Sequence, residues 1–249
     1  MKFIIQDTKE EIAKTAADLV EAAVRENPHG VLGLATGSSP VGLYKELSKR
    51  SKAGLDFSGI STLNLDEYIG LDGFHEQSYH YFMKRNLFDG INIDQKNTQV
   101  PRGDSPDPEK EAKRYEELIQ AAPPAMIQIL GIGVNGHIGF NEPSDAFIME
   151  THVADLTRET IDVNARFFDS VYDVPKQAIT MGVGAILRAE KIILIALGEA
   201  KQTAVKALED GRITPRNPST ILKVHPDVTV LCDKAAAALL NVENLKLED

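Results

Sequence analysis

The chain has 249 residues, with 27 Lys and Arg against 37 Asp and Glu, and so carries a formal net charge of −10. This length can bury a sizeable core without disulfide or metal staples, and a composition of 43% hydrophobic and 26% charged residues argues against wholesale disorder. The acidic balance argues against a nucleic-acid surface, because phosphate backbones select clustered Lys and Arg. A small phosphate ligand stays open, since it needs only two or three local cations and some backbone amides.

Cysteine usage and hydropathy bear on the compartment. The single cysteine, Cys232, cannot form an intrachain disulfide or a cysteine zinc site. The first residues turn polar too early for a signal-peptide core. The longest apolar run, Ile192–Leu197, is far shorter than the roughly 20 residues of a membrane-spanning helix. We therefore expect a soluble cytoplasmic protein that uses neither a metal nor a membrane.

In the first half of the chain, short apolar runs alternate with amphipathic stretches. Thr8 and Glu11 predict a capping box before a first helix, and Ser39 followed by Pro40 predicts the start of a second. Strands are predicted at 31–35, 60–65 and 126–132, and further helices at 77–88 and 107–119. Residues 133–145 are rich in Gly and Asn and are expected to form a long ordered loop.

The second half continues this alternation. Strands are predicted at 151–156, 192–197 and 228–232, and helices at 157–168 with Thr157 as cap, 176–189, 199–209 and the Ala-rich stretch after 232. Strands that are apolar throughout and alternate with helices predict a mostly parallel sheet covered on both faces. Because no repeat, linker or low-complexity tract divides the chain, we expect one three-layer α/β/α domain over residues 1–249 with a Rossmann-like central sheet.

In an open α/β sheet, ligands bind outside the carboxyl ends of the strands. Thr36, Gly37, Ser38 and Ser39 follow the strand at 31–35 and lead into a helix N-terminus, where unpaired N–H groups and the helix dipole favour an anion. A plain helix cap is the alternative reading of this turn. No Gly-Lys-Ser/Thr follows, which disfavours nucleoside triphosphates and leaves a monophosphate.

Titratable side chains follow the other predicted strands. Asp66 follows the strand at 60–65, His137 and Glu142 lie in the long loop with Asn135 before them, and Lys201 follows the strand at 192–197. A histidine titrates near neutrality, and a carboxylate or amide can fix its tautomer, which suits proton transfer. A structural histidine and a solvent-facing aspartate are the ordinary alternatives. Together with the turn at 36–39, the set favours phosphate binding combined with acid/base chemistry.

The segment from Gly131 to Gly136 is a literal GxGxxG, and Asp155 lies roughly 20 residues further on, as in a dinucleotide-binding site. That fingerprint requires its last glycine to open a helix on the sheet. Residues 137–143 instead contain another glycine, poor helical periodicity and a proline. We therefore expect a loop here and no NAD site.

Several segments, in order along nearly the whole chain, resemble one family. They are Leu32–Pro40, Asn64–Tyr68, Gly131–Pro143, Asn164–Phe168, Val174–Lys176, Thr180–Gly184 and Gly198–Lys201. Their sequences are similar to those of the glucosamine-6-phosphate deaminases (the glucosamine/galactosamine-6-phosphate isomerase family). GHIGFNEP, which ends at Pro143, is the most specific segment, whereas the TGSSP turn is shared with sugar-phosphate isomerases and lactonases.

The resemblance implies conversion of glucosamine 6-phosphate and water to fructose 6-phosphate and ammonia in amino-sugar catabolism, by a hydrolase/isomerase without a cofactor. It assigns His137 to the opening of the pyranose ring, with Asn135 and Glu142 setting its proton state. Asp66 would then move a proton from C2 to C1 through an enolamine. The phosphate would be held by Arg166, Lys201 and the turn of Thr36, Gly37, Ser38 and Ser39.

The chain departs from the family pattern in two places. Some members have aspartate where this chain has Asn135, and an amide can orient His137 but cannot stabilise an imidazolium by charge. Allosterically regulated members carry a basic pair after the GHIGFNEP loop, whereas the matching stretch Thr151–Ala154 has neither Arg nor Lys. We therefore expect no activation by N-acetylglucosamine 6-phosphate. The oligomeric state, monomer or small homo-oligomer, stays open.

Two other functions remain in view. A 6-phosphogluconolactonase-like hydrolase would bind a similar sugar phosphate but needs no base at C2. A non-catalytic sugar-phosphate sensor would need a DNA-binding element, and no basic recognition helix is visible in the sequence.

Overall fold

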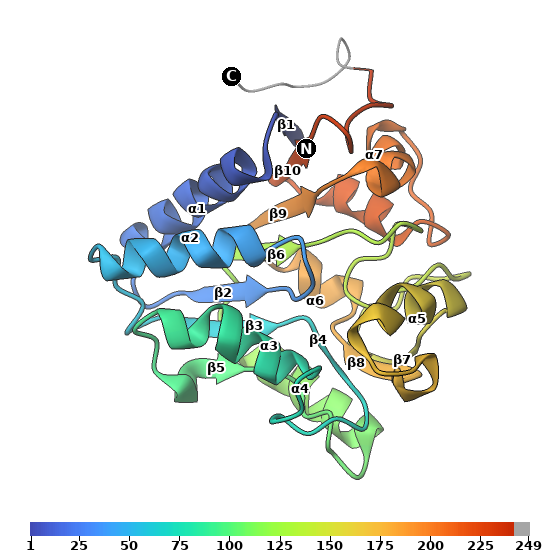
Figure 1. The fold of residues 1–249 in the computed structure, drawn as a ribbon, viewed down its shortest axis with the longest axis horizontal. Helices are drawn as coiled ribbons and strands as arrows, with labels where there is room; N and C mark the ends of the chain where they lie inside the picture. Colours follow the sequence, from blue (N-terminus) through green and yellow to red (C-terminus); the bar gives the residue numbers. More distant parts are fainter. Residues whose placement is uncertain (242–249) are drawn as a thin grey trace.

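A computed structural model describes residues 1–241 and places a seven-stranded sheet at the centre, in the order β1-β10-β9-β6-β2-β3-β5 (Figure 1). Every strand pair in it is parallel. The strands are β1 (Lys2–Gln6), β2 (Val31–Leu34), β3 (Ser61–Asn64), β5 (Thr98–Gln99), β6 (Ile127–Leu130), β9 (Lys191–Ala196) and β10 (Val228–Asp233). The predicted α/β class with a mostly parallel central sheet is confirmed.

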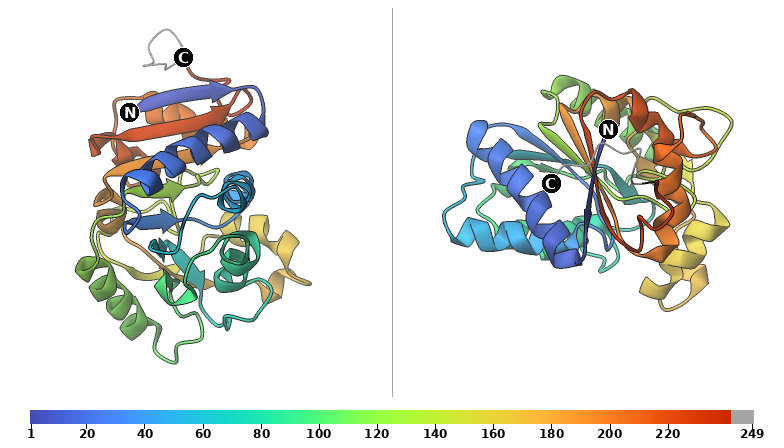
Figure 2. Two further views of the ribbon diagram at one scale, coloured as in Figure 1. Left: turned by 90° about the vertical axis from the view of Figure 1, so that its left-hand side faces the viewer. Right: turned by 90° about the horizontal axis from the view of Figure 1, so that it is seen from above.

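Helices lie on both faces of this sheet (Figure 2). One face carries α1 (Lys9–Glu26), α2 (Val41–Lys52) and α3 (Tyr79–Asn86), and the other carries α4 (Pro108–Ala121), α6 (Val183–Leu187) and α7 (Gln202–Glu209). Right-handed crossovers require this division, because the connections run toward β5 in the first group and toward β10 in the second. The predicted capping box of α1 is present, with Thr8 and Glu11 bonded reciprocally.

A second, three-stranded antiparallel sheet was not predicted. It consists of β4 (Asp66–Tyr68), β8 (Gln177–Thr180) and β7 (His152–Asp155), in the order β4-β8-β7. The prediction of a helix over 176–189 is therefore wrong for its first half, and only α6 is helical. Pairing with β4 and β7 outweighs the local helical pattern there.

Two other local predictions are also wrong. Ser39 does not cap α2, whose N-cap is Pro40 with no side-chain hydrogen bond. The Ala-rich stretch after β10 forms turns instead of a helix, with the N–H of Ala236 bonded to the carboxylate of Asp233. The single domain predicted over 1–249 stays a prediction, and its last residues, 242–249, lie outside the described part of the chain.

The order of the strands creates a switch point between β2 and β6. The chain leaves β2 toward β3, whereas it leaves β6 in the opposite direction, toward β9. The loops that follow these two strands therefore diverge and open a crevice at the carboxyl edge of the sheet. Within residues 1–241, no helix is long and apolar enough to cross a membrane.

Candidate active site

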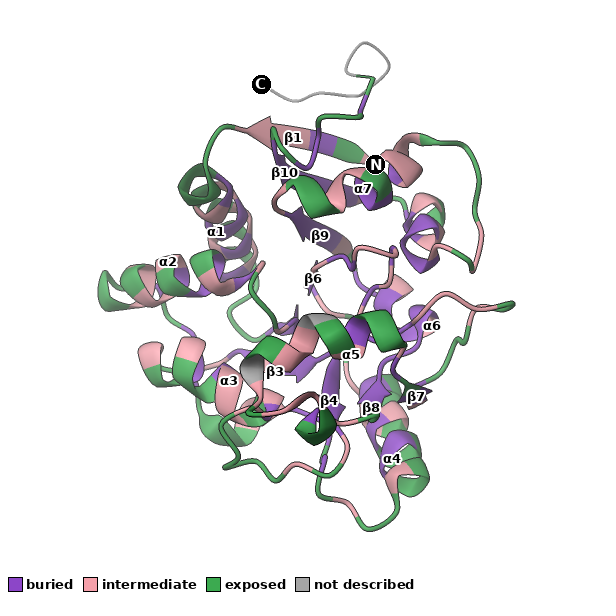
Figure 3. Ribbon diagram, turned by 45° about the vertical axis from the view of Figure 1, so that its right-hand side comes forward, coloured by how far each residue is buried: buried purple, intermediate pink, exposed green. Residues whose placement is uncertain are grey.

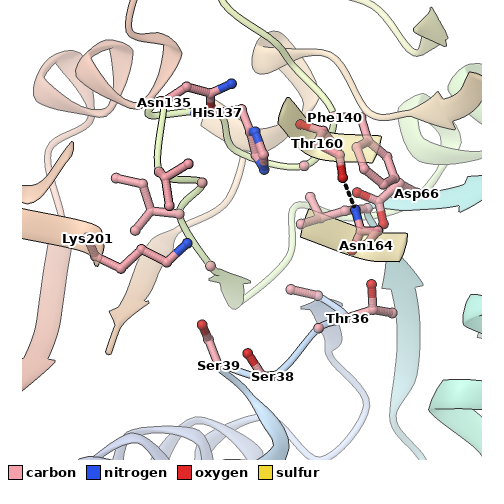
Figure 4. A pocket seen from close by; sticks show the side chains of 18 of the residues that line it. Thr36, Ser38, Ser39, Asp66, Asn135, His137, Phe140, Thr160, Asn164 and Lys201 are labelled. Atoms are coloured by element: carbon pink, nitrogen blue, oxygen red, sulfur yellow. Dashed lines mark hydrogen bonds between the residues drawn. The ribbon is translucent and has the colours of Figure 1, made fainter. Parts of the chain in front are cut away.

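A cavity of about 170 Å³ opens at this crevice, where β2, β3, β6 and β9 end (Figure 4). Its lining includes every residue that the sequence analysis nominated except Glu142: Thr36, Gly37, Ser38, Ser39, Asp66, Asn135, His137, Arg166 and Lys201. Lys201 and Asp66 lie on opposite sides of the cavity, and His137 points in between them. The fold therefore gathers segments that are up to 165 positions apart in the sequence, from Thr36 to Lys201.

One side of the cavity is built to receive an anion. Gly37 has a φ of +87°, a left-handed conformation that glycine adopts at little cost, and the turn leads into the N-terminus of α2. Lys201 follows β9, and its pKa is lowered by burial and by the positive charge of Arg166, while Glu159 opposes this shift. Two cations close enough to repel each other beside a helix N-terminus form a site that a phosphate dianion would stabilise.

The other side holds a buried carboxylate. Asp66 begins β4, directly after the chain leaves β3, and its side chain is only slightly exposed. Among the described residues, none donates a hydrogen bond to its carboxylate. Burial raises its pKa to about 8, with a further contribution from the charge of Glu67. A carboxylate with this pKa is a far stronger base than a solvent-exposed aspartate.

Glu142 lies behind His137, outside the cavity lining. Its Oε2 accepts a hydrogen bond from Nδ2 of Asn135 at 2.9 Å and lies 3.3 Å from Nδ1 of His137. Asn135 also accepts the backbone N–H of His137, at 3.1 Å. Burial alone would raise the pKa of Glu142, but the imidazole of His137 beside it, with the hydrogen bonds from Thr160 and Asn135, lowers it. The carboxylate is thus ionised and aimed at the imidazole.

The loop that carries these groups is irregular, as predicted. Residues 133–145 contain no helix, and Gly136, with a φ of +85°, opens none. A side chain at Gly136 would collide with Asn217, which packs against this turn. No group of His, Cys, Asp or Glu side chains able to hold a metal ion occurs within residues 1–241. Independence of metals and cofactors stays a prediction.

The cavity wall also contains residues that were not predicted, among them Tyr79, Phe140, Glu159, Thr160 and Asn164. Tyr79 and Phe140 stack with ring centroids 6.0 Å apart and an interplanar angle of 7°. The other three belong to α5 (Arg158–Asn164). The signal for Thr160 was its spacing of three residues from the predicted cap Thr157, which placed both on one side of the helix.

A sequence model of the family described as Glucosamine-6-phosphate isomerases/6-phosphogluconolactonase matches residues 5–231. The chain belongs to this family. Two similar relatives are named glucosamine-6-phosphate deaminase. The relative from Thermoanaerobacter pseudethanolicus is 51% identical and aligns over 99% of this chain and 98% of its own. The relative from Clostridium perfringens is 51% identical and aligns over 96% of this chain and 100% of its own.

Solved structures of the deaminase/isomerase family show the same fold. A monomeric glucosamine-6-phosphate deaminase superposes with a TM-score of 0.94 at 42% identity, covering 96% of this chain and 100% of that one. A 6-phosphogluconolactonase from Leishmania guyanensis superposes with a TM-score of 0.75 at 21% identity, covering 96% of this chain and 99% of that one. The lactonase shares the fold alone, whereas the deaminases are similar in sequence along nearly their whole length.

Proposed function

We propose that the protein converts glucosamine 6-phosphate and water to fructose 6-phosphate and ammonia. The observation that carries this proposal is that the carboxylate of Asp66 is buried, with a pKa raised to about 8, in a cavity that also contains the cations Arg166 and Lys201. A sugar-phosphate isomerase needs a base for a weakly acidic C–H bond, and a plain hydrolase does not. The relatives named glucosamine-6-phosphate deaminase favour the amino sugar as substrate.

The first step opens the pyranose ring. In the closed sugar C1 is a hemiacetal, so the proton of its hydroxyl must leave O1 while the ring oxygen O5 gains one. The imidazole of His137, which faces the cavity, is suited to carry that proton between the two oxygens. Glu142, which accepts a hydrogen bond from Asn135 and lies 3.3 Å from Nδ1 of His137, orients the imidazole ring for this transfer.

The second step uses Asp66. Once C1 is an open-chain aldehyde, the C2 proton becomes acidic. The carboxylate removes it while the substrate's own ammonium group passes a proton to O1, which gives an enolamine. The same proton is returned to C1, which leaves an iminium at C2. Water adds to that carbon and ammonia departs, so the product is a ketose. Arg166, Lys201 and the amides of residues 36–39 hold the phosphate, and this anchoring places C1 and C2 against Asp66.

The test measures ammonia release from glucosamine 6-phosphate. Wild type and a matched surface variant, Asp210→Asn, are expected to release ammonia at the same rate. Asp66→Asn is expected to lose at least about a thousandfold in kcat, and His137→Gln to lose less, because the open-chain form also arises in water. No ammonia from the wild type would overturn the proposal.

The same variants separate the lactonase alternative. Hydrolysis of 6-phosphogluconolactone removes no proton from C2, so Asp66→Asn would spare that activity. A non-catalytic sensor would bind the sugar phosphate and turn over neither compound. The designation hydrolase, which the sequence analysis expected, has no support beyond the net consumption of water, and isomerisation with deamination describes the chemistry better. A cytoplasmic location belongs to the same proposal, since the substrate is a phosphorylated metabolite.

A further inference from the structure

Thr160 is a buried hydroxyl on a helix whose other residues are largely exposed or half-buried (Figure 3). Its Oγ1 accepts a hydrogen bond from Oγ1 of Thr157, at 3.1 Å, and the hydroxyl of Thr157 in turn accepts the backbone N–H of Thr160. Because Thr157 supplies the proton in the first of these bonds, the hydroxyl proton of Thr160 is free for another acceptor. That acceptor is Oε1 of Glu142.

The two carboxylate oxygens of Glu142 are therefore used differently. Oε2 accepts a hydrogen bond from Asn135 and lies 3.3 Å from Nδ1 of His137, and both of these residues belong to the same loop as Glu142. Oε1 accepts a hydrogen bond from Thr160 of α5. Among the described partners of this carboxylate, Thr160 is the one from another element. Without it, Oε1 of the half-buried Glu142 would have no donor among the described residues, and the carboxylate could rotate away from the imidazole.

We propose that Thr160 is a positioning residue whose hydroxyl fixes the carboxylate of Glu142 so that its second oxygen faces Nδ1 of His137. The role in ring opening rests on the proposed function above, but the role in holding Glu142 does not. The same helix continues into the 3₁₀ turn Ala165–Phe167, which carries Arg166. The segment formed by α5 and this turn thus contacts both parts of the site. Arg166 lies on the phosphate-binding side, and Thr160 contacts Glu142 behind the ring-opening His137.

Kinetics test the catalytic part. Thr160→Val keeps the shape of the side chain and removes the hydroxyl, and Thr160→Ser keeps the hydroxyl. We expect kcat for ammonia release to fall about tenfold to a hundredfold in Thr160→Val with KM within about twofold, and to stay near wild type in Thr160→Ser. Thr98→Val, a matched change on the edge strand β5, controls for the cost of the substitution. Thr160→Ala serves where the valine variant does not fold.

A second readout needs no activity. With ¹³C-labelled glutamate carboxyls, and with Glu142→Gln to assign the signal, NMR follows the titration of Glu142 directly. Loss of a donor raises the pKa of a carboxyl, so the midpoint for Glu142 should move to higher pH in Thr160→Val and stay in place in Thr160→Ser. An unmoved midpoint in Thr160→Val overturns the inference, and so does unchanged kcat in an enzyme that releases ammonia. A wild type that releases no ammonia refutes the proposed function, while the NMR titration still decides whether Thr160 holds Glu142.

Discussion

The carboxylate of Asp66 lies where a negative charge is unfavourable, buried and close to Glu67. The sequence correctly predicted that Asp66 follows a strand at the carboxyl edge of the sheet, because an apolar run followed by Asp-Glu is a local pattern. Its burial was not visible, since that depends on β8 pairing with β4 and on Gly139, whose backbone approaches the carboxylate of Asp66. The raised pKa is thus a product of tertiary structure.

Asp66→Asn should stabilise the protein at neutral pH. The folded-state pKa is about 8, against about 3.9 in an unfolded chain, so the folded state binds the proton more tightly. Folding stability therefore falls as pH rises between these two values. The amide removes this penalty, and we expect a gain of at least about 2 kcal/mol at pH 7, or roughly 4–8 °C in Tm. Thermal melts at pH 7 and pH 4 check this: the gain should shrink at the lower pH, and an equal gain at both would contradict it.

The pH dependence of turnover should report the titration of Asp66. A base must be deprotonated to act, so kcat/KM should rise with pH and level off above about 8, the pKa given for Asp66. Burial is the main cause of this raised pKa and the charge of Glu67 adds to it, so Glu67→Gln should shift the rise to lower pH. Because both enzymes meet the same substrate, titration of the substrate cannot cause a difference between the profiles. Coincident profiles would show that Glu67 does not influence Asp66.

Other residues show where sequence reasoning ends. The order Asn135, His137, Glu142 was readable, but not that Asn135 bonds to the backbone of His137 and to Glu142 instead of to the imidazole. Ser39 was predicted both to cap a helix and to line the phosphate site, and it lines the cavity without capping the helix. Thr160 was missed because its partner Glu142 is 18 positions away, and its spacing from Thr157 indicates a side of the helix but not this contact.

At the scale of elements, predictions succeeded where the signal is local. Thr8, Asp107 and Thr157 each cap the helix that they were expected to begin. Predictions failed where distant pairing decides, as for β8. The stretch after β10 forms turns although Asp233 accepts the N–H of Ala236 as a helix N-cap would, and nothing in its local pattern explains this. Caps act within one turn, whereas strand pairing joins segments that a sequence window does not contain.

Gly182 lies between β8 and α6, within the segment 176–189 that was predicted to be one helix. A substitution there tests how closely this segment packs against its neighbours. A Cβ there would lie 2.3 Å from the carbonyl oxygen of Glu150 and 2.4 Å from the backbone of Met149. Gly182→Ala should therefore destabilise the protein by about 1–3 kcal/mol. Gly211→Ala is the matched control, since nothing lies within 4 Å of a Cβ at that position. Urea unfolding measures both, and equal midpoints for the two variants would contradict the close approach.

At the scale of the whole molecule, the parallel sheet was predictable and the arrangement of the site followed from it. Apolar strands that alternate with helices leave few topologies, and ligands bind at the carboxyl edge in all of them. The second sheet was not predictable, because β4, β8 and β7 are short and come from three distant segments. That sheet carries Asp66 and so completes the cavity.

N-acetylglucosamine 6-phosphate should leave the rate curve unchanged. A second cavity, of about 320 Å³, lies beside Glu142 and is lined by His152, Val153 and Ala154 of β7, within the stretch where regulated members of the family carry their basic pair. Its lining among the described residues includes neither Lys nor Arg. An activator phosphate there would lose its hydration without gaining a cation, which opposes binding. Initial rates against glucosamine 6-phosphate should be hyperbolic with and without the acetylated sugar, apart from competition at high concentration. A sigmoidal curve that the compound straightens would refute this prediction and place a phosphate site elsewhere on the molecule.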